Sequence, residues 1–369
     1  MKAAIPEAID ATARPQGDAV SACAPELLVV VDTEEEFDWS QPFSRSNTAT
    51  RSIPAQAAVQ PIYDRLGVVP TYVIDYPVAT DPAAVAFLRR LKEEGRAEIG
   101  AHLHPWVTPP HEEKVSARNS YECNLPPSLE RSKIAALTDA IESAFGDRPS
   151  VFKAGRHGFG ASTARAIAAL GYKVDCSLLP YHDMSRSGGP DFARACAQPH
   201  WLYAAPNVLE VPVTNGFFGR LAKVGPTIAH LFDNPAAARL RIPGLLGKAG
   251  LLTRSRLTPE GVPAAEQCRL LDALVKNGQR VFTLVYHSPS LVPGNTPYVR
   301  SESELAAFLA TIEQVLTYFR DVIGGRFATL TEVHARMSAE RAESAPGARP
   351  GRRAQFDPPV AAAGRAARG

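Results

Sequence analysis

The sequence of 369 residues contains few cysteines and lacks any long apolar run. Its five cysteines lie far apart and form no Cys-x-x-Cys pair, which excludes a thiolate zinc cluster and a disulfide framework and favours reduced thiols. No stretch reaches the ~18 apolar residues that a membrane span requires. Acidic residues and prolines interrupt residues 1–25, so this segment lacks the apolar core of a signal peptide. We therefore expect a cytoplasmic protein.

The charge balance and the glycine pattern exclude two further classes. A net charge of +2 provides no strongly basic surface, so a nucleic-acid partner is not expected. No Gly-x-Gly-x-x-Gly motif follows the first predicted strand, which argues against a dinucleotide site. Apolar residues make up 45% and charged residues 21%, as in an ordinary globular protein. The oligomeric state is not indicated.

Composition divides the chain into three parts. Residues 1–25 are predicted to be a mobile leader, and residues 26–335 one folded domain. Residues 219–263 fit the pattern of this domain poorly and are predicted to be a helical insertion. Residues 336–369 are rich in Ala, Arg, Pro and Gly with few apolar anchors, which predicts a disordered tail.

Within the domain, short apolar runs alternate with amphipathic segments. Strands are predicted at residues 27–31, 68–74, 97–101, 151–153, 209–213, 281–286 and 327–330. Helices are predicted at residues 54–66, 82–95, 128–145, 162–170 and 301–319. This alternation favours an α/β fold with a parallel sheet closed into a barrel. An open, doubly wound sheet is the alternative.

The first strand ends in a group of carboxylates. Apolar β-branched residues lead into Asp32, and Glu34, Glu35, Glu36 and Asp38 follow closely. Alternate side chains of an extended backbone share a face, so Asp32 and Glu34 are expected to point the same way. Crowded carboxylates repel one another, and a divalent cation would compensate them. A solvated acidic loop is the alternative interpretation.

A pair of histidines follows another predicted strand. Residues 97–101 lead into His102 and His104, whose spacing of two places both imidazoles on one face. Together with a carboxylate they could form a three-ligand metal site with one open position. His111, in the following loop, is a rival second histidine.

Two further strand ends carry polar residues. Lys153 and Arg156 lie in a glycine-rich turn, where a cation could hold Asp32 ionised. His287 follows the strand at 281–286, and its ordinary pKa near ~6.5 suits proton donation. Tyr298 lies in the long loop beyond it and could line a sugar-sized groove.

Taken in order, these segments resemble the motif series of the polysaccharide deacetylase family, the NodB-homology or carbohydrate esterase 4 group. The motifs VDTEEEFDW, EIGAHLHPW, FKAGRHGFG, DCSLLPY and YHSPSLVPGNTPY resemble its WalW-like branch more narrowly. The resemblance covers residues 27–330. It implies a distorted (β/α) barrel of about seven strands and metal-assisted removal of acetyl groups from N- or O-acetylated sugars.

The resemblance also implies roles for individual residues. Asp32 matches the catalytic base and His287 the catalytic acid. Glu34 and His102 match metal ligands, with His104 or His111 as the second imidazole. Either Lys153 or Arg156 matches the arginine that orients the base. Zn²⁺ is the expected ion, with Co²⁺ as an alternative.

The chain departs from the family pattern at three motifs. The first motif usually has adjacent aspartates, whereas Asp32 and Glu34 are two apart. The second usually has histidines four apart, but Trp106 occupies that place. Lys153 stands where arginine is usual. These changes bear on the identity and affinity of the metal more than on the fold.

The implied function is a metal-dependent carbohydrate deacetylase. In the implied mechanism, Asp32 takes a proton from water, a backbone N–H within residues 178–181 stabilises the oxyanion, and His287 protonates the leaving amine. Tyr181 and Tyr298 are the expected substrate-binding residues. The alternatives are a cytosolic amidohydrolase that acts on a small molecule, and a glycan-binding relative without catalysis.

Overall fold

The structure is a computed structural model that describes residues 24–344. The chain divides into two units after His334. The first unit contains all of the described strands, and the described part of the second is the continuation of helix α10 (Leu330–Ser344) beyond His334. The prediction of a disordered tail is therefore wrong for residues 336–344, which are helical. Residues 1–23 of the predicted leader and 345–369 of the predicted tail lie outside the described range.

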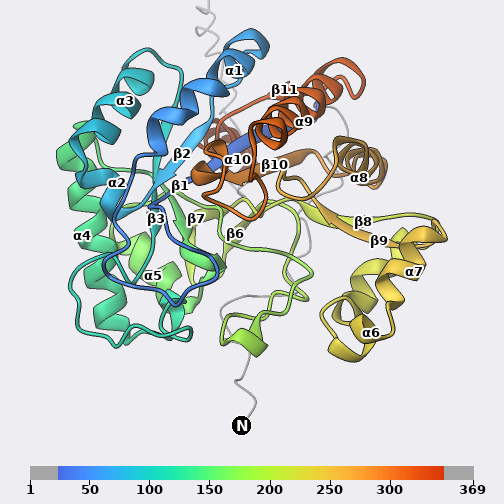
Figure 1. Cartoon of the computed structure of the whole chain (residues 1–369), viewed down its shortest axis with the longest axis horizontal. Coiled ribbons are helices and arrows are strands. Elements are labelled where there is room, and N and C mark those ends of the chain that lie inside the picture. The colour runs from blue at the N-terminus through green and yellow to red at the C-terminus, as the bar shows by residue number, and fades with distance from the viewer. Residues whose placement is uncertain (1–23, 345–369) are drawn as a thin grey trace, which may run out of the picture. The chain divides into compact units, whose positions relative to one another are not determined.

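The first unit is built on a mainly parallel sheet (Figure 1). Eight of its nine described strands follow the order β10-β1-β2-β3-β4-β5-β7-β6, and the ninth, β11, pairs with β1. The strands are β1 (Glu26–Thr33), β2 (Thr71–Ile74), β3 (Glu98–Leu103), β4 (Val151–Ala154), β5 (Val174–Asp175), β6 (His200–Leu202), β7 (Ala205–Glu210), β10 (Val281–His287) and β11 (Arg326–Phe327). Among the described strands of this sheet, only β6 and β7 pair in antiparallel orientation. The sheet is a curled half-barrel, so the α/β fold of distorted-barrel type is confirmed, while full closure is not seen among the described strands.

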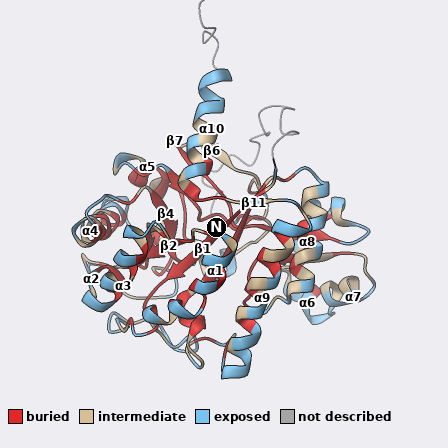
Figure 2. Ribbon diagram, turned by 90° about the horizontal axis from the view of Figure 1, so that it is seen from above, coloured by how far each residue is buried: buried red, intermediate tan, exposed pale blue. Residues whose placement is uncertain are grey.

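Ten α-helices are described, of which α6 and α7 lie beside a separate two-stranded sheet (Figure 1). They are α1 (Gln60–Leu66), α2 (Tyr76–Thr80), α3 (Pro82–Glu93), α4 (Pro127–Phe145), α5 (Ala161–Ala169), α6 (Pro235–Arg239), α7 (Ile242–Lys248), α8 (Ala264–Lys276) and α9 (Glu302–Asp321), besides α10. Short 3₁₀ helices are η1 (Ile53–Ala58), η2 (Glu122–Asn124), η3 (Gly155–His157), η4 (Ser185–Ser187), η5 (Ala222–Leu231) and η6 (Ser288–Leu291). Figure 2 shows the strands buried and the outer faces of the helices exposed. Among the described helices, none has the length and apolar character needed to cross a membrane.

Local sequence signals explain the main elements. Every residue of β1 is buried, as expected for a β-branched strand covered on both faces. At the start of α3, the Asp81 carboxylate accepts a hydrogen bond from the backbone N–H of Ala84 at 2.8 Å. Helix α4 ends where Gly146 adopts a left-handed conformation with φ of 83°, which glycine tolerates without strain.

The strand register brings the polar strand ends together. Asp32 of β1 pairs with His287 of β10, and His102 of β3 pairs with Lys153 of β4. All of these residues lie at the carboxyl ends of parallel strands, where barrel-type folds place their chemistry. Residues that are 255 positions apart in sequence are therefore neighbours at one edge of the sheet.

The segment at 219–263 is not simply the helical insertion that its composition predicts. It contains η5, α6 and α7, but also strand β9 (Thr253–Arg256), which pairs antiparallel with β8 (Asn215–Phe218) in a separate two-stranded sheet. Ala229 and Leu252 of this segment form a small apolar core with Phe217 of β8. The strand pairing was missed because β9, with the sequence TRSR, lacks the apolar alternation of a typical strand.

Candidate active site

Asp32 forms a buried ion pair at the end of β1. Both of its carboxylate oxygens lie 2.5 Å from Lys153 Nζ, and both side chains are almost fully buried. Burial alone would raise the pKa of Asp32, but the charges of Lys153 and His287 and the hydrogen bonds from Lys153 outweigh it and hold the pKa well below its ordinary value. Asp32 is therefore an ionised carboxylate, as its predicted role as a base requires.

His287 lies between two carboxylates. Its Nε2 is 3.7 Å from Asp32 Oδ2, and its Nδ1 is 2.8 Å from Glu260 Oε2. The other oxygen of Glu260 accepts hydrogen bonds from the backbone N–H of His287 at 3.0 Å and from the Ser290 hydroxyl at 2.7 Å. Burial lowers the pKa of His287, but Glu260 and Asp32 outweigh this effect and raise it above its ordinary value. The arrangement favours a protonated imidazole beside the base.

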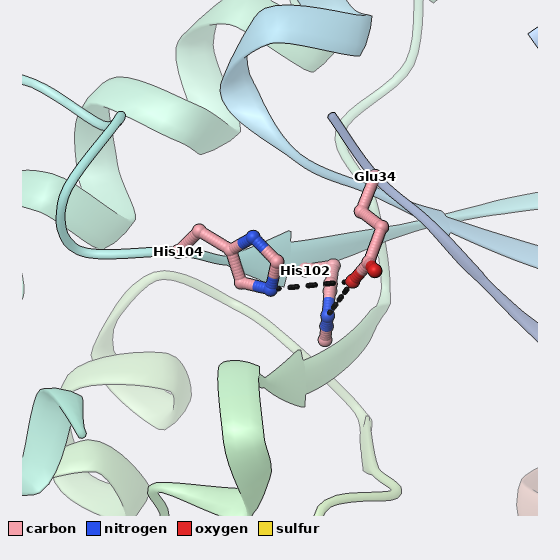
Figure 3. Close-up of side chains that lie close together, drawn as sticks. All are labelled: Glu34, His102 and His104. Carbon is pink, nitrogen blue, oxygen red and sulfur yellow. Dashed lines mark ion pairs between the residues drawn. The ribbon is translucent and has the colours of Figure 1, made fainter. Parts of the chain in front are cut away.

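Glu34, His102 and His104 form a buried triangle (Figure 3). Glu34 Oε2 lies 3.6 Å from His102 Nε2 and 3.4 Å from His104 Nε2. Ligand atoms about 2.1 Å from a tetrahedral ion are about 3.4 Å apart, so these gaps match the spacing around one ion. The predicted set of metal ligands is therefore brought together. His111 lies outside this group and is exposed.

The electrostatics of the triangle also fit a cation. Glu34 Oε1 is buried and has no hydrogen-bond partner. Burial and the charges of Glu35 and Asp32 raise the pKa of Glu34 well above its ordinary value. His102 Nδ1 lies 3.1 Å from the carbonyl oxygen of Lys153, an acceptor, so His102 carries its proton there and turns a free Nε2 lone pair toward Glu34. A divalent cation would satisfy both the carboxylate and the imidazoles.

A second buried network adjoins the triangle. Glu35 contacts His104 and Trp106, and its backbone N–H donates to Asp75 Oδ2 at 2.6 Å. Burial raises the pKa of Glu35 to about 7 and also raises the pKa of Asp75 well above its ordinary value. The proximity of the two carboxyl groups raises the pKa of Asp75 further and lowers that of Glu35.

Three residues of the site were missed in the sequence: Glu260, Glu35 and Asp75. Glu35 was visible only as part of an acidic run. Asp75 directly follows β2, and the rule that placed the other site residues at strand ends could have found it. Glu260 lies in the loop between β9 and α8, and no sequence pattern connects it to His287.

Arg156 does not orient Asp32. Its guanidinium lies 4.0 Å from the centre of the Tyr121 ring and donates hydrogen bonds to the Tyr121 and Ser120 hydroxyls. The left-handed backbone at Arg156, with φ of 54°, turns its side chain away from the direction of Lys153. Of the two predicted cations, Lys153 is the one that contacts the base.

The turn at residues 178–181 offers one candidate donor for an oxyanion. The N–H of Leu178 donates to Glu210, the N–H of Tyr181 donates to the carbonyl oxygen of Phe192, and Pro180 has none, which leaves the N–H of Leu179. The Tyr181 ring packs edge-on against Phe217 at 5.2 Å, as part of the small core of the insertion. The predicted role of the Tyr181 side chain in substrate binding is therefore not supported by its contacts, while the oxyanion role of the turn stays a prediction that rests on Leu179.

A groove of about 560 Å³ lies beside His287. Its walls are residues 36–40 and 294–297, with Arg300. The Trp39 ring, which is 36% exposed, stands perpendicular to His287 at 5.1 Å and to Tyr298 at 5.7 Å between ring centres. Trp39 thus lies between the groove and His287. Tyr298 contacts Trp39 but is not among the residues that line the groove, and its role in substrate binding stays a prediction.

Comparison with known proteins finds solved structures of the same fold, but no matching family model and no matching curated protein. A candidate glycoside hydrolase/deacetylase from Parabacteroides distasonis is 10% identical, with a TM-score of 0.54 over 86% of this chain and 72% of that chain. The Puue allantoinase is 14% identical, with a TM-score of 0.53 over 90% and 97% of the two chains. A candidate polysaccharide deacetylase from Mycobacterium smegmatis is also 14% identical, with a TM-score of 0.50 over 87% and 93%.

At these identities the likeness shows the fold alone. It confirms the fold that the motif series implies. The narrower WalW-like branch stays a prediction.

Because Gly155 has no side chain, the carbonyl group of Leu103 and the ring of His104 can lie against its backbone. A Cβ atom at this position would contact the carbonyl oxygen of Leu103 and lie 2.5 Å from His104 Cδ2. We expect Gly155→Ala to displace His104, to lower the free energy of unfolding by ~1–3 kcal/mol and to weaken Zn²⁺ binding. Chemical denaturation and zinc titration test this. Gly244→Ala is the control, because open space surrounds Gly244 in α7; equal behaviour of the two variants would contradict the prediction.

Proposed function

We propose that this chain, which has the fold of the polysaccharide deacetylases of the carbohydrate esterase 4 group, is a metal-dependent hydrolase that removes acetyl groups from an acetylated carbohydrate. One observation carries the proposal: the buried Glu34–His102–His104 triangle lies beside an ionised carboxylate and a histidine. Asp32 is two residues from Glu34, and its partner His287 is held by Glu260. A base, an acid and a cation site thus meet at one edge of the sheet.

The triangle would hold the cation through one carboxylate oxygen and two imidazole nitrogens, and Zn²⁺ suits this donor set. When bound, such an ion polarises a carbonyl oxygen and lowers the pKa of water. Asp32, kept ionised by Lys153, takes the proton from the attacking water. His287 donates its proton to the departing amine or alcohol, and Glu260 stabilises the charged imidazole until then.

The groove beside His287 supports a carbohydrate substrate. It combines the aromatic surface of Trp39 with polar groups from Asp38, Ser40, Asn295 and Arg300. Sugar rings offer apolar C–H faces and many hydroxyl groups, which such a mixed lining complements. A small cyclic amide is the second candidate, favoured by the fold shared with the Puue allantoinase. Such a substrate would leave the groove empty.

The first prediction concerns metal content. We expect about one equivalent of Zn²⁺ in the purified protein, loss of it in His102→Ala, and loss of acetate release together with the metal. Elemental analysis and an acetate assay on acetylated oligosaccharides measure both.

His111→Ala is the matched control for this experiment, because His111 is exposed and outside the triangle. It should retain metal and activity. A parent protein that takes up neither Zn²⁺ nor Co²⁺ would contradict the proposed function.

The second prediction concerns pH. Because the pKa of Asp32 is held low, the base stays ionised across neutrality; the proton of His287 is lost as the pH rises through its raised pKa. The rate should therefore fall at alkaline pH. In Glu260→Gln the charge that raises the pKa of His287 is removed, so this fall should move by about one unit to lower pH.

The pH dependence of kcat/KM measures this shift. Glu266→Gln is the control, since Glu266 accepts a hydrogen bond from Ser255 and has no contact with His287. A profile that stays flat through the alkaline range, or one that Glu260→Gln leaves in place, would refute the role of His287 as acid.

The third prediction separates the two substrate classes. Trp39→Ala should raise KM for an acetylated oligosaccharide about tenfold, equivalent to ~1.4 kcal/mol, and change turnover of a monosaccharide less. Tyr203→Ala removes another aromatic side chain, 73% exposed, and should change neither. Hydrolysis of cyclic amides without turnover of any acetylated sugar would establish the second candidate instead.

A further inference from the structure

We infer that Glu35 is a positioning residue that orients His104 for metal binding, and that Trp106 and Asp75 hold Glu35 in place for this task. The inference rests on the proposed function, because it assigns a role toward the same metal site. It also gives a reason for tryptophan at position 106, where the resemblance leads one to expect a histidine.

Both oxygens of the Glu35 carboxylate are engaged. Oε2 lies 2.7 Å from His104 Nδ1, and Oε1 accepts a hydrogen bond from Trp106 Nε1 at 2.7 Å. All three side chains are buried, with Glu35 fully inaccessible to solvent. The rings of His104 and Trp106 also stack at 4.3 Å with 25° between their planes. The contact with Glu35 and the stacking on Trp106 together fix the His104 imidazole in one orientation.

The backbone of Glu35 is fixed by the neighbouring strand. Its N–H donates to Asp75 Oδ2 at 2.6 Å, while Asp75 Oδ1 accepts the N–H of Val78 at 2.9 Å and thereby caps α2. Asp75 follows directly on β2, which pairs with β1. The position of Glu35 is thus tied to the sheet.

This arrangement selects the form of His104 that can bind a metal. A carboxylate oxygen accepts hydrogen bonds, so His104 Nδ1 carries the ring proton and donates it to Glu35. The other nitrogen, Nε2, then has a free lone pair, and it faces Glu34 Oε2 at 3.4 Å. Metal-binding histidines commonly donate their second nitrogen to a carboxylate, and removal of that partner costs 10–100-fold in affinity.

Glu35, Asp75 and His104 could themselves be considered a metal site, because their ligand atoms also lie within 4.8 Å of one another. Their contacts argue against this. The His104–Glu35 distance of 2.7 Å is that of a direct hydrogen bond, shorter than the ~3.4 Å between ligands of one ion. The unpartnered oxygen belongs to Glu34, in the first triangle. The network around Glu35 is therefore the support, and the triangle is the site.

The test is Glu35→Gln, which keeps the size of the side chain. Its amide has one acceptor oxygen for two donors, Trp106 Nε1 and His104 Nδ1. If the oxygen faces Trp106, the amide N–H₂ faces His104 and forces the ring proton onto Nε2. We expect the affinity for Zn²⁺ to fall ~10–100-fold, with a changed visible spectrum of the Co²⁺ form. Competition against a chelator at fixed pH measures the affinity.

Glu36→Gln is the matched control. Glu36 is the next residue in sequence, but its carboxylate contacts the backbone N–H of Ser52 and the side chain of Arg51. It should leave the affinity and the cobalt spectrum unchanged. Thermal unfolding of each metal-free variant shows whether the fold is retained.

Each outcome decides a different claim. A parent protein that binds no Zn²⁺ refutes the proposed function itself. Parent-like affinity and spectrum in a folded Glu35→Gln refute the inference and leave the function intact. If Glu35→Gln does not fold, Trp106→Phe decides, since it keeps the ring stack but removes one donor to Glu35. For Trp106→Phe we expect a several-fold loss of affinity for Zn²⁺, toward the lower end of the ~10–100-fold range expected for Glu35→Gln. An unchanged affinity for Zn²⁺ would overturn the inference.

Discussion

The concentration of buried carboxylates at the end of β1 is the constraint on which the site depends. Asp32, Glu34 and Glu35 are each at most 4% exposed, and three negative charges in so little space cannot be stable without compensation. Each is compensated differently. Lys153 neutralises Asp32, the network of His104, Trp106 and Asp75 holds Glu35, and Glu34 has only two neutral imidazoles and an unpartnered oxygen. Glu34 is thus the carboxylate whose charge is not compensated, and the proposed cation would bind there.

The parallel sheet brings further polar side chains next to these carboxylates. Since β1 lies between β10 and β2, its carboxyl end meets His287 on one side and Asp75 on the other. The proposed base and acid belong to adjacent strands. Of the proposed metal ligands, His102 belongs to β3, Glu34 directly follows β1, and His104 directly follows β3. The segment between β8 and α8, which interrupts the strand–helix alternation, supplies Glu260, which contacts the proposed acid His287.

Much of this could be predicted from the sequence, because it follows from short-range patterns. Apolar runs that end in polar residues located β1, β3, β4 and β10 and the residues Asp32, His102, Lys153 and His287. The rest depends on contacts that sequence spacing does not encode. Glu260 reaches His287 across a loop, Arg156 is turned away by a left-handed backbone, and β9 has no apolar alternation. The choice between Lys153 and Arg156, and between His104 and His111, needed three-dimensional distances.

The central claim is that Glu34, His102 and His104 hold one divalent cation next to Asp32 and His287. X-ray absorption at the zinc edge of the zinc-loaded protein tests it most directly, because the scattering pattern of imidazole rings reports how many histidines bind the ion. The account predicts two imidazoles and oxygen ligands at about 2.0–2.1 Å, and one imidazole in His104→Ala. A spectrum without imidazole scattering, or one that His104→Ala leaves unchanged, would contradict it.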